Sequence, residues 1–195
     1  WIHEAFATYA EAVYVECEFS KEKAVDYLNG IRKRIKNNKT IIGKYGVNNE
    51  GSSDMYYKGA NFVHTLRTVL DDDEKWWDLL KSFVSTYQYQ TINTDDVLAH
   101  FQSVYNIDLQ PIFHQYLNHK KLPKLLFKNQ NDRLEIKWKT DVENFQMPID
   151  IDYEGQKERF LVTKNWKEIK QFSSIRSLKN HIDQRNMYFN INVDK

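Results

Sequence analysis

The chain opens with 1-WIHEAFATYAEA-12, which places a His-Glu pair at the start of an expected helix. In the H-E-x-x-H motif the two histidines lie one helical turn apart, so both bind one zinc ion while the glutamate between them handles a water molecule. Here the residue at the position of the second histidine is Ala7. His3 and Glu4 are therefore not the usual pair of that motif, and Glu4 needs another explanation.

The remaining residues that could do chemistry form no recognisable set by spacing. No two of the six histidines are four residues apart, and His114 and His119, five apart, should diverge on a helix. The sequence contains no G-x-S-x-G, and the single cysteine, Cys17, lies in an expected helix without an obvious base. Spacing alone therefore predicts neither a self-contained zinc site nor a nucleophilic triad.

Composition narrows the class of protein. The 195 residues can bury a sizeable core, and 41% hydrophobic with 14% aromatic residues is typical of a globular chain. A net charge of +1 leaves no strongly basic field for nucleic acid, and no apolar stretch approaches the ~20 residues of a membrane span. One cysteine leaves the compartment open, whether exported, periplasmic or cytoplasmic. Because residue 1 is Trp inside an amphipathic helix, we expect a piece of a longer protein.

Helices are expected over the first 120 residues, where apolar residues recur at helical spacing. Residues 37–55 are rich in asparagine and glycine and are expected to form a long loop. Carboxylates in 71-DDDE-74 suit the positive end of a helix dipole. The other expected helices are one capped by Ser20, one over 55–70, one over 95–105 capped by Thr94, and one over 109–120 capped by Asp108.

At Leu122-Pro123 the period changes from 3.6 to 2, which predicts strands. Residues 133–139 alternate, and two alternating runs within 147–163 flank the hairpin turn signal Glu154-Gly155-Gln156. Helices that precede strands indicate an α+β chain of two packed domains. We expect a helical domain over residues 1–122 and a small antiparallel β-sandwich or sheet over 123–195.

Three segments in order resemble the aminopeptidase N-like zinc metallopeptidases (peptidase family M-one, gluzincins). The stretch 1-WIHEAFATYAEA-12 resembles the family's W-L-N-E-G-F-A-x-Y-x-E segment. The stretch 55-MYYKGANFVHTLR-67 is similar to its P-Y-E-K-G-x-x-x-x-x-L segment. Residues 94–125 resemble the run that leads into the family's β-sandwich domain. The resemblance implies the helical second half of a thermolysin-like catalytic domain, followed by that sandwich.

The resemblance also implies roles for particular residues. Glu4 matches the third zinc ligand, and Tyr56 matches the tyrosine whose hydroxyl binds the oxyanion of the tetrahedral intermediate. Thr8 and Glu11 fall at i+4 and i+7 from Glu4, on the same helix face, and are candidates to hydrogen-bond and so orient a zinc-bound histidine. The implied activity of the parent enzyme is removal of N-terminal residues from peptide substrates, with zinc as the cofactor.

Each role has a simpler alternative. Glu4 would serve equally as an ordinary first-turn carboxylate favoured by the helix dipole. Tyr56 would serve as a core or interface aromatic residue like its neighbour Tyr57, and 51-GSSD-54 as either a cleft lining or a turn. His3, where the family often has Asn, is expected to make a structural polar contact and not to bind metal. Two mild departures are Ala5 in place of the family's Gly and Tyr57 in place of its Glu.

The larger departure is that the 195 residues contain neither the H-E-x-x-H helix nor the G-x-M-E-N segment that holds the substrate's amino group in relatives. We therefore expect the isolated chain to be inactive, to bind zinc weakly or not at all, and to have the missing N-terminal half of the catalytic domain as its partner. One alternative is a non-catalytic peptide- or protein-binding module, a pseudo-peptidase on the same fold. Another is an independent protein that resembles the family by chance.

Overall fold

The computed structural model of the chain describes residues 1–44, 46–47, 51–130, 133–153, 155–170, 172 and 174–193. Seven helices lie within this part of the chain: α1 (Ile2–Glu18), α2 (Lys21–Arg32), α3 (Asp54–Leu70), α4 (Asp73–Tyr87), α5 (Thr94–Gln102), α6 (Gln110–Asn118) and α7 (Ile175–His181). Its strands are β1 (Lys124–Gln130), β2 (Arg133–Lys139), β3 (Met147–Tyr153), β4 (Gln156–Val162), β5 (Lys167–Glu168) and β6 (Asn190–Val193).

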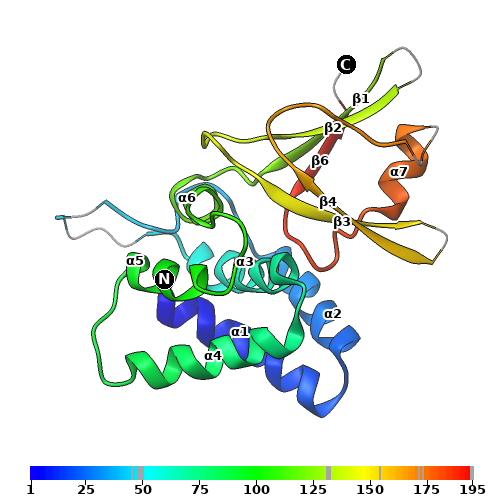
Figure 1. The fold of residues 1–195 in the computed structure, drawn as a ribbon. Helices are drawn as coiled ribbons and strands as arrows, with labels where there is room; N and C mark the ends of the chain where they lie inside the picture. The colour runs from blue at the N-terminus through cyan, green and yellow to red at the C-terminus, as the bar shows by residue number, and fades with distance from the viewer. Residues whose placement is uncertain are drawn as a thin grey trace.

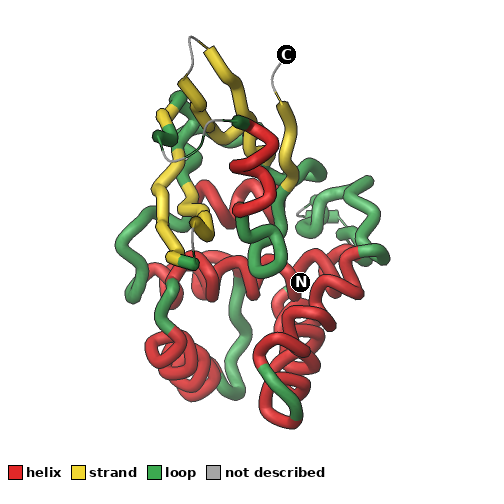
Figure 2. Tube along the Cα trace, turned by 90° about the vertical axis from the view of Figure 1, so that its right-hand side faces the viewer, coloured by secondary structure: helices red, strands yellow, loops and turns green. Residues whose placement is uncertain are grey.

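The helices α1 to α6 gather at one end of the molecule, and the strands with α7 gather at the other (Figure 1). Figure 2 shows the same separation from the side, with the strands above the helical layer. The predicted α+β class, a helical region followed by a small β region, is confirmed. The described residues include no helix that is both long enough and apolar enough to cross a membrane.

The β region contains two small sheets. One has the strand order β5-β2-β1-β6, and the other is the hairpin β3-β4. The β3–β4 hairpin is antiparallel as predicted, and the pairs β1–β2 and β2–β5 are antiparallel as well. Strand β6 runs parallel to β1 and so departs from the expected antiparallel sheet. The predicted β3–β4 turn has Gly155 at φ 78°, a conformation that glycine adopts without strain, while Glu154 lies outside the described residues.

The parallel pairing of β6 has a cause that local periodicity does not reveal. The alternating pattern of apolar residues also did not predict helix α7. After α7, the chain passes along the helical region before it enters the sheet as β6. There Arg32 donates to the carbonyl oxygens of Gln184 (2.7 Å) and Arg185 (3.0 Å), and the Tyr116 hydroxyl donates to that of Tyr188 (2.7 Å). These long-range bonds fix where residues 184–188 lie, and with them the direction in which β6 enters.

Of the three predicted N-caps, the one at Ser20 is confirmed. The side chain of Ser20 accepts a hydrogen bond from the backbone N–H of Lys23, as expected of an N-cap. For α5 the predicted cap was wrong, because Thr94 is the first helical residue and Asn93 precedes it. Asn93 accepts from the N–H groups of Asp95 and Asp96, and the Asp96 carboxylate accepts from the Asn93 N–H in return. At α6 the N-cap position is Leu109 and not Asp108, although the Asp108 carboxylate accepts from the Gln110 N–H at 2.9 Å.

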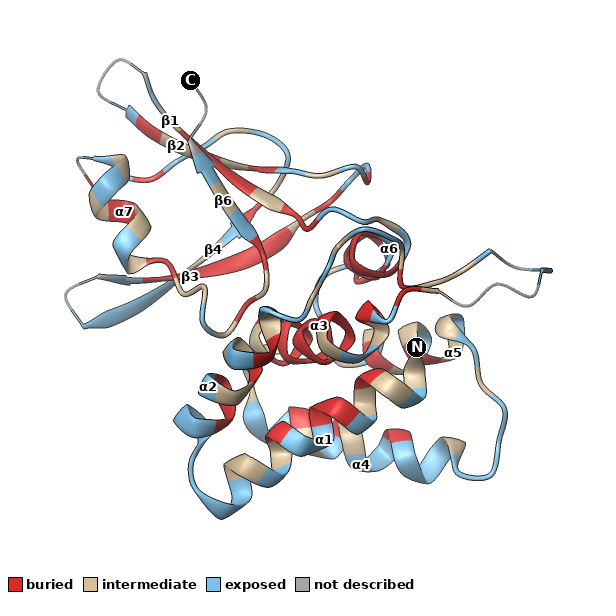
Figure 3. Cartoon of the chain, turned by 180° about the vertical axis from the view of Figure 1, so that it is seen from behind, coloured by how far each residue is buried: buried red, intermediate tan, exposed pale blue. Residues whose placement is uncertain are grey.

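Helix α3 is buried around most of its circumference, as the red ribbon in Figure 3 shows. A buried polar side chain needs a hydrogen-bond partner, and those of α3 find theirs on other elements. Asp54 binds the turn after α2, Lys58 the end of α6, and Asn61 a side chain of α2. Thr65 binds the segment before β6, and Arg67 binds both α1 and α4.

The C-terminal end of α3 is held by the β3–β4 hairpin. The last carbonyl groups of a helix have no partner within it. Here Arg159 of β4 donates to the carbonyl oxygens of Thr68 (2.6 Å) and Val69 (2.9 Å). Its cross-strand neighbour Asp150, which is buried, accepts two further bonds of 2.8 Å from the same guanidinium. The hairpin therefore caps α3 and joins the β region to it.

Helices α1 and α3 approach each other closely at Gly59. A Cβ atom added there would lie 2.7 Å from the Cβ of Ala5 and 3.2 Å from its Cα. The first separation is shorter than any ordinary carbon–carbon contact, so a side chain at Gly59 would push the two helices apart. The small residues at both positions thus set the distance between α1 and α3.

This packing predicts that Gly59→Ala destabilises the chain. Overpacking costs about 1–3 kcal/mol, which outweighs the ~1 kcal/mol that alanine gains over glycine in a helix. Urea unfolding should show a lower midpoint for Gly59→Ala. The control is Gly30→Ala in α2, where an added Cβ meets nothing within 4 Å and the midpoint should rise. Equal stabilisation by both substitutions would contradict the close crossing.

Candidate functional site

Glu4 lies in the first turn of α1, where the helix dipole favours a carboxylate. Its side chain is half-buried, whereas the neighbouring Ala5 is fully buried against α3. The start of α1 is held from outside the helix, because the Trp1 indole N–H donates to the Thr94 hydroxyl at 2.9 Å. Glu4 therefore sits on a fixed helix end while its carboxylate still reaches the surface of the described residues.

Tyr56 lies in the first turn of α3 and is 37% exposed, in contrast to the buried residues that begin at Lys58. Its backbone N–H donates to the Ser53 carbonyl oxygen at 3.3 Å. The ring of Tyr57 packs at 6.4 Å from that of Tyr56, and the Tyr57 hydroxyl accepts from Arg34 at 3.1 Å. The two adjacent tyrosines thus differ in exposure. Tyr57 is half-buried and binds Arg34, which follows α2, whereas Tyr56 is the more exposed of the two.

The helix crossing at Gly59 relates these two candidates to each other. Glu4 immediately precedes Ala5, and Tyr56 lies three residues, about one turn, before Gly59. The first turn of α1 is therefore packed against the beginning of α3. The structure brings together the two helix ends that carry the carboxylate and the phenol singled out from the sequence.

The two residues expected to support Glu4 lie in different surroundings. Thr8 is buried, like Ala5, Tyr9 and Ala12 of the same helix. Glu11 is exposed, and its carboxylate accepts a short hydrogen bond from the Tyr27 hydroxyl of α2. Partial burial and the Glu11 carboxylate raise the pKa of Tyr27 to about 12, so this phenol remains a donor at neutral pH. Glu11 thus already links α1 to α2.

The stretch 51-GSSD-54 forms a turn that leads into α3. The Ser52 and Asp54 side chains are buried, and the Ser52 hydroxyl accepts from the Asp54 N–H at 3.1 Å. Asp54 in turn accepts from the N–H groups of Lys36 (2.9 Å) and Asn37 (2.6 Å). Of the two roles left open by the sequence, the contacts favour the turn, which fixes the approach to Tyr56.

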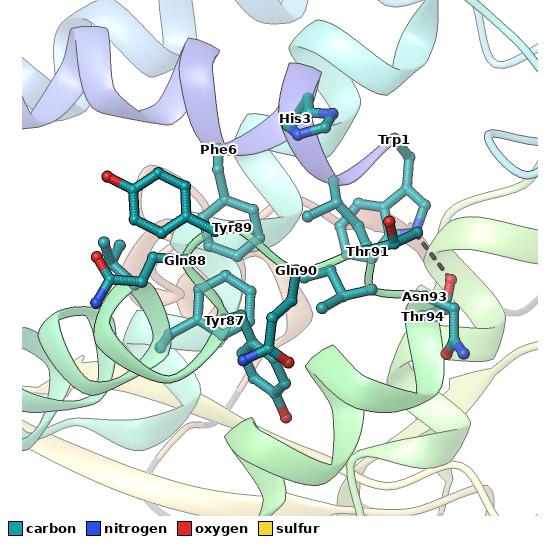
Figure 4. Close-up of a pocket in the computed structure, with 14 residues that line it drawn as sticks. Trp1, His3, Phe6, Tyr87, Gln88, Tyr89, Gln90, Thr91, Asn93 and Thr94 are labelled. Atoms are coloured by element: carbon teal, nitrogen blue, oxygen red, sulfur yellow. Dashed lines mark hydrogen bonds between the residues drawn. The ribbon is translucent and has the colours of Figure 1, made fainter.

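His3 lies at the edge of a pocket of about 760 Å³ beside the start of α1 (Figure 4). The pocket is lined largely by aromatic and amide side chains, including Trp1, Phe6, Tyr87 and Gln88. The dashed line in Figure 4 is the bond from Trp1 to Thr94 that closes one side. His3 is exposed there, in a setting with few metal-binding groups.

The other histidines partly depart from expectation. His114 and His119 were predicted to diverge on one helix, but α6 ends at Asn118 and their rings lie 5.0 Å apart. Burial and the nearby His114 lower the pKa of His119. His64 is buried in α3, where desolvation lowers its pKa to about 4 and keeps it neutral at pH 7.

The most stringent question about the candidate site is whether its residues could hold a zinc ion. A glutamate carboxylate is an established zinc ligand, so the donor at Glu4 has suitable chemistry. Across the described ranges, however, no three His, Cys, Asp or Glu side chains gather in a group that could hold a metal. Within those ranges the residues do not make a complete zinc site on their own, since a catalytic site uses three protein ligands.

Sequence reasoning missed the buried charges of α3. Lys58 is fully buried, and its ammonium donates to two backbone carbonyl oxygens beyond the end of α6. Arg67 is also buried and binds the Glu16 carboxylate through two nitrogens, at 2.6 and 2.9 Å. The sequence signal for this burial was the placement of both residues among apolar residues at helical spacing. Charged side chains are almost never fully buried unless they are paired, so that signal alone would not have been decisive.

A comparison with protein-family models matches residues 1–116 to the Peptidase family M1 domain. The match contains α1 to α5, most of α6, and the candidate residues Glu4, Thr8, Glu11 and Tyr56. A search among curated proteins finds no significant match. The family match confirms the resemblance seen in the three sequence segments. Because it covers more than half of the 195 residues, the chain belongs to peptidase family M1.

Proposed function

We propose that the chain is part of a zinc-dependent aminopeptidase, in which Glu4 is one zinc ligand and Tyr56 stabilises the oxyanion during peptide hydrolysis. Family membership supports a peptidase, and members of this family are generally zinc-dependent. The observation that carries the proposal is the crossing at Gly59, which packs the Glu4 end of α1 against the Tyr56 end of α3. The remaining zinc ligands belong to an H-E-x-x-H segment that is not among the 195 residues.

Glu4 suits the role of a zinc ligand because of its charge and its position in the first turn of α1. A carboxylate offsets part of the charge of a divalent ion, and its negative charge is well placed at the positive end of α1. When bound, zinc in such a site supplies Lewis-acid polarisation of the scissile carbonyl and activation of water. The half-buried position limits the motion of Glu4, so less conformational entropy is lost when it binds.

Tyr56 suits the oxyanion role because of where its helix begins. Its position in the first turn of a buried helix fixes the backbone that carries the phenol, while the side chain itself is partly exposed. A prepositioned hydroxyl donor stabilises negative charge that develops in the transition state more than it stabilises the neutral ground-state carbonyl. It would therefore act on the chemical step more than on substrate binding.

The isolated 195-residue protein is expected to be inactive. It contributes one zinc ligand, and the general-base glutamate of an H-E-x-x-H helix is not in its sequence. The measurement is hydrolysis of an aminoacyl-fluorophore by pure protein with added zinc, compared with zinc alone. Clear turnover by the pure protein would overturn the proposal that these residues are only part of the catalytic site.

In the zinc-loaded enzyme that contains this chain, Tyr56→Phe should lower kcat by about 10²–10³, the usual effect of losing an oxyanion donor. KM and zinc content should change little, because the phenyl ring remains and no zinc ligand is lost. The matched control is Tyr57→Phe, which removes a hydroxyl that binds Arg34 at the surface. A fully active Tyr56→Phe enzyme would exclude the proposed role.

A further inference from the structure

Lys58 is a buried cation that the proposed chemistry does not use. It lies two residues after Tyr56, with a relative exposure of 0%. Removing an ammonium group from water is costly unless hydrogen bonds and charges compensate. Its position therefore needs a compensating interaction, and the contacts of its Nζ atom identify one.

The ammonium of Lys58 binds the chain where α6 ends. Nζ donates to the carbonyl oxygens of His119 (3.0 Å) and Lys120 (3.3 Å), directly after the last helical residue, Asn118. A cation at this end of a helix also interacts favourably with the negative end of the dipole. These bonds connect the first turns of α3 to the C-terminus of α6, across more than sixty residues of sequence.

The charges around Lys58 agree with this arrangement. Burial lowers the pKa of Lys58 to about 8, while the nearby Asp54 carboxylate opposes the shift. The group is therefore mostly protonated at neutral pH. Asp54 is itself held by the backbone N–H groups of Lys36 and Asn37, so it does not have to move toward Lys58 to be satisfied.

The same end of α6 also anchors the segment on the other side of Tyr56. The N–H groups of Ile41 and Ile42 both donate to the Leu117 carbonyl oxygen, at 3.0 and 3.1 Å. The Ser52 N–H then donates to the Thr40 carbonyl oxygen at 3.0 Å, which joins the turn before α3 to that anchored pair. Tyr56 thus lies between two segments that are both hydrogen-bonded to the C-terminus of α6, residues 41–42 before it and Lys58 after it.

The approach of these segments is close enough to constrain sequence. A Cβ atom at Gly51 would lie only 1.7 Å from the Ile41 carbonyl oxygen, so no side chain fits there. The turn before α3 cannot relax away from residue 41 without breaking the Ser52–Thr40 bond. One attachment is therefore made through backbone groups, and the other depends on a single side chain, that of Lys58.

We propose that Lys58 is a positioning residue, which holds the first turn of α3 against the C-terminus of α6 and so fixes the place of the Tyr56 phenol. The catalytic role of Tyr56 in this inference rests on the proposed function, whereas the attachment of α3 to α6 through Lys58 does not depend on it. Lys58 does not touch the reacting atoms in this account. It acts through the backbone that carries Tyr56.

The test compares Lys58→Met, which keeps a side chain of similar length but removes the charge and the donors, with Lys58→Arg, which retains both. Hydrogen exchange of the full 195-residue chain reports on the first turn through the Met55 and Tyr56 amides, which donate to Ser52 and Ser53. The matched control is Lys81→Met, a side chain 77% exposed on α4.

In Lys58→Met we expect the Met55 and Tyr56 amides to exchange about tenfold faster or more, the usual scale for losing a hydrogen bond to a charged group. Amides in the middle of α3, such as those of Val63 and Leu66, should keep their wild-type protection. Lys58→Arg and Lys81→Met should resemble wild type. Unchanged exchange at Met55 and Tyr56, equal acceleration along all of α3, or Lys58→Arg exchanging as fast as Lys58→Met would each overturn the proposal.

Should Lys58→Met fail to fold, the wild-type chain provides a second measurement. Nuclear magnetic resonance couplings across the hydrogen bonds from Lys58 Nζ to the carbonyl carbons of His119 and Lys120 should be present, and their absence would contradict the attachment. In the zinc-loaded enzyme, Lys58→Met should lower kcat with little change in KM. If Tyr56→Phe proved fully active, the proposed function would fail while the exchange result still decided the role of Lys58.

Discussion

The near-complete burial of α3 is the constraint on which the rest of the structure depends. A helix enclosed on most sides must place its polar side chains against partners, and each partner then becomes fixed relative to the helix. Arg67 does this for α1 and α4, Lys58 for the end of α6, and Asp54 for the turn after α2. At its C-terminus, Arg159 extends the same principle to the β region.

This constraint explains how a small number of contacts can organise the proposed half-site. Tyr56 stands at one end of α3, and the β3–β4 hairpin caps the other. Between them, Gly59 permits α1 to approach closely enough that Glu4 and Tyr56 project from helix ends packed against each other. Positioning thus comes from backbone proximity and from buried hydrogen bonds, while the two candidate side chains themselves remain partly accessible.

Much of the fold was predictable from local patterns. The cap at Ser20, the helix that carries Tyr56 and the change to strands after Pro123 follow from capping chemistry and hydrophobic period, and all are observed. Features decided by distant partners were not predictable. The parallel strand β6 depends on bonds from α2 and α6, and the His114–His119 contact depends on α6 ending at Asn118. The place of Lys58 among apolar residues could have indicated its burial, but not its partners, which are carbonyl groups more than sixty residues away.

The candidate site was predictable only through resemblance, since the spacing of Glu4 and Tyr56 carries no metal or oxyanion signal in itself. The most direct test of the central claim, that Glu4 is a zinc ligand, is the zinc affinity of the enzyme that contains this chain, with Glu4→Gln compared with Glu18→Gln at the exposed end of the same helix. An amide cannot supply the carboxylate charge, so Glu4→Gln should bind zinc more than about tenfold more weakly, while Glu18→Gln binds normally. Full zinc affinity in Glu4→Gln would contradict the account.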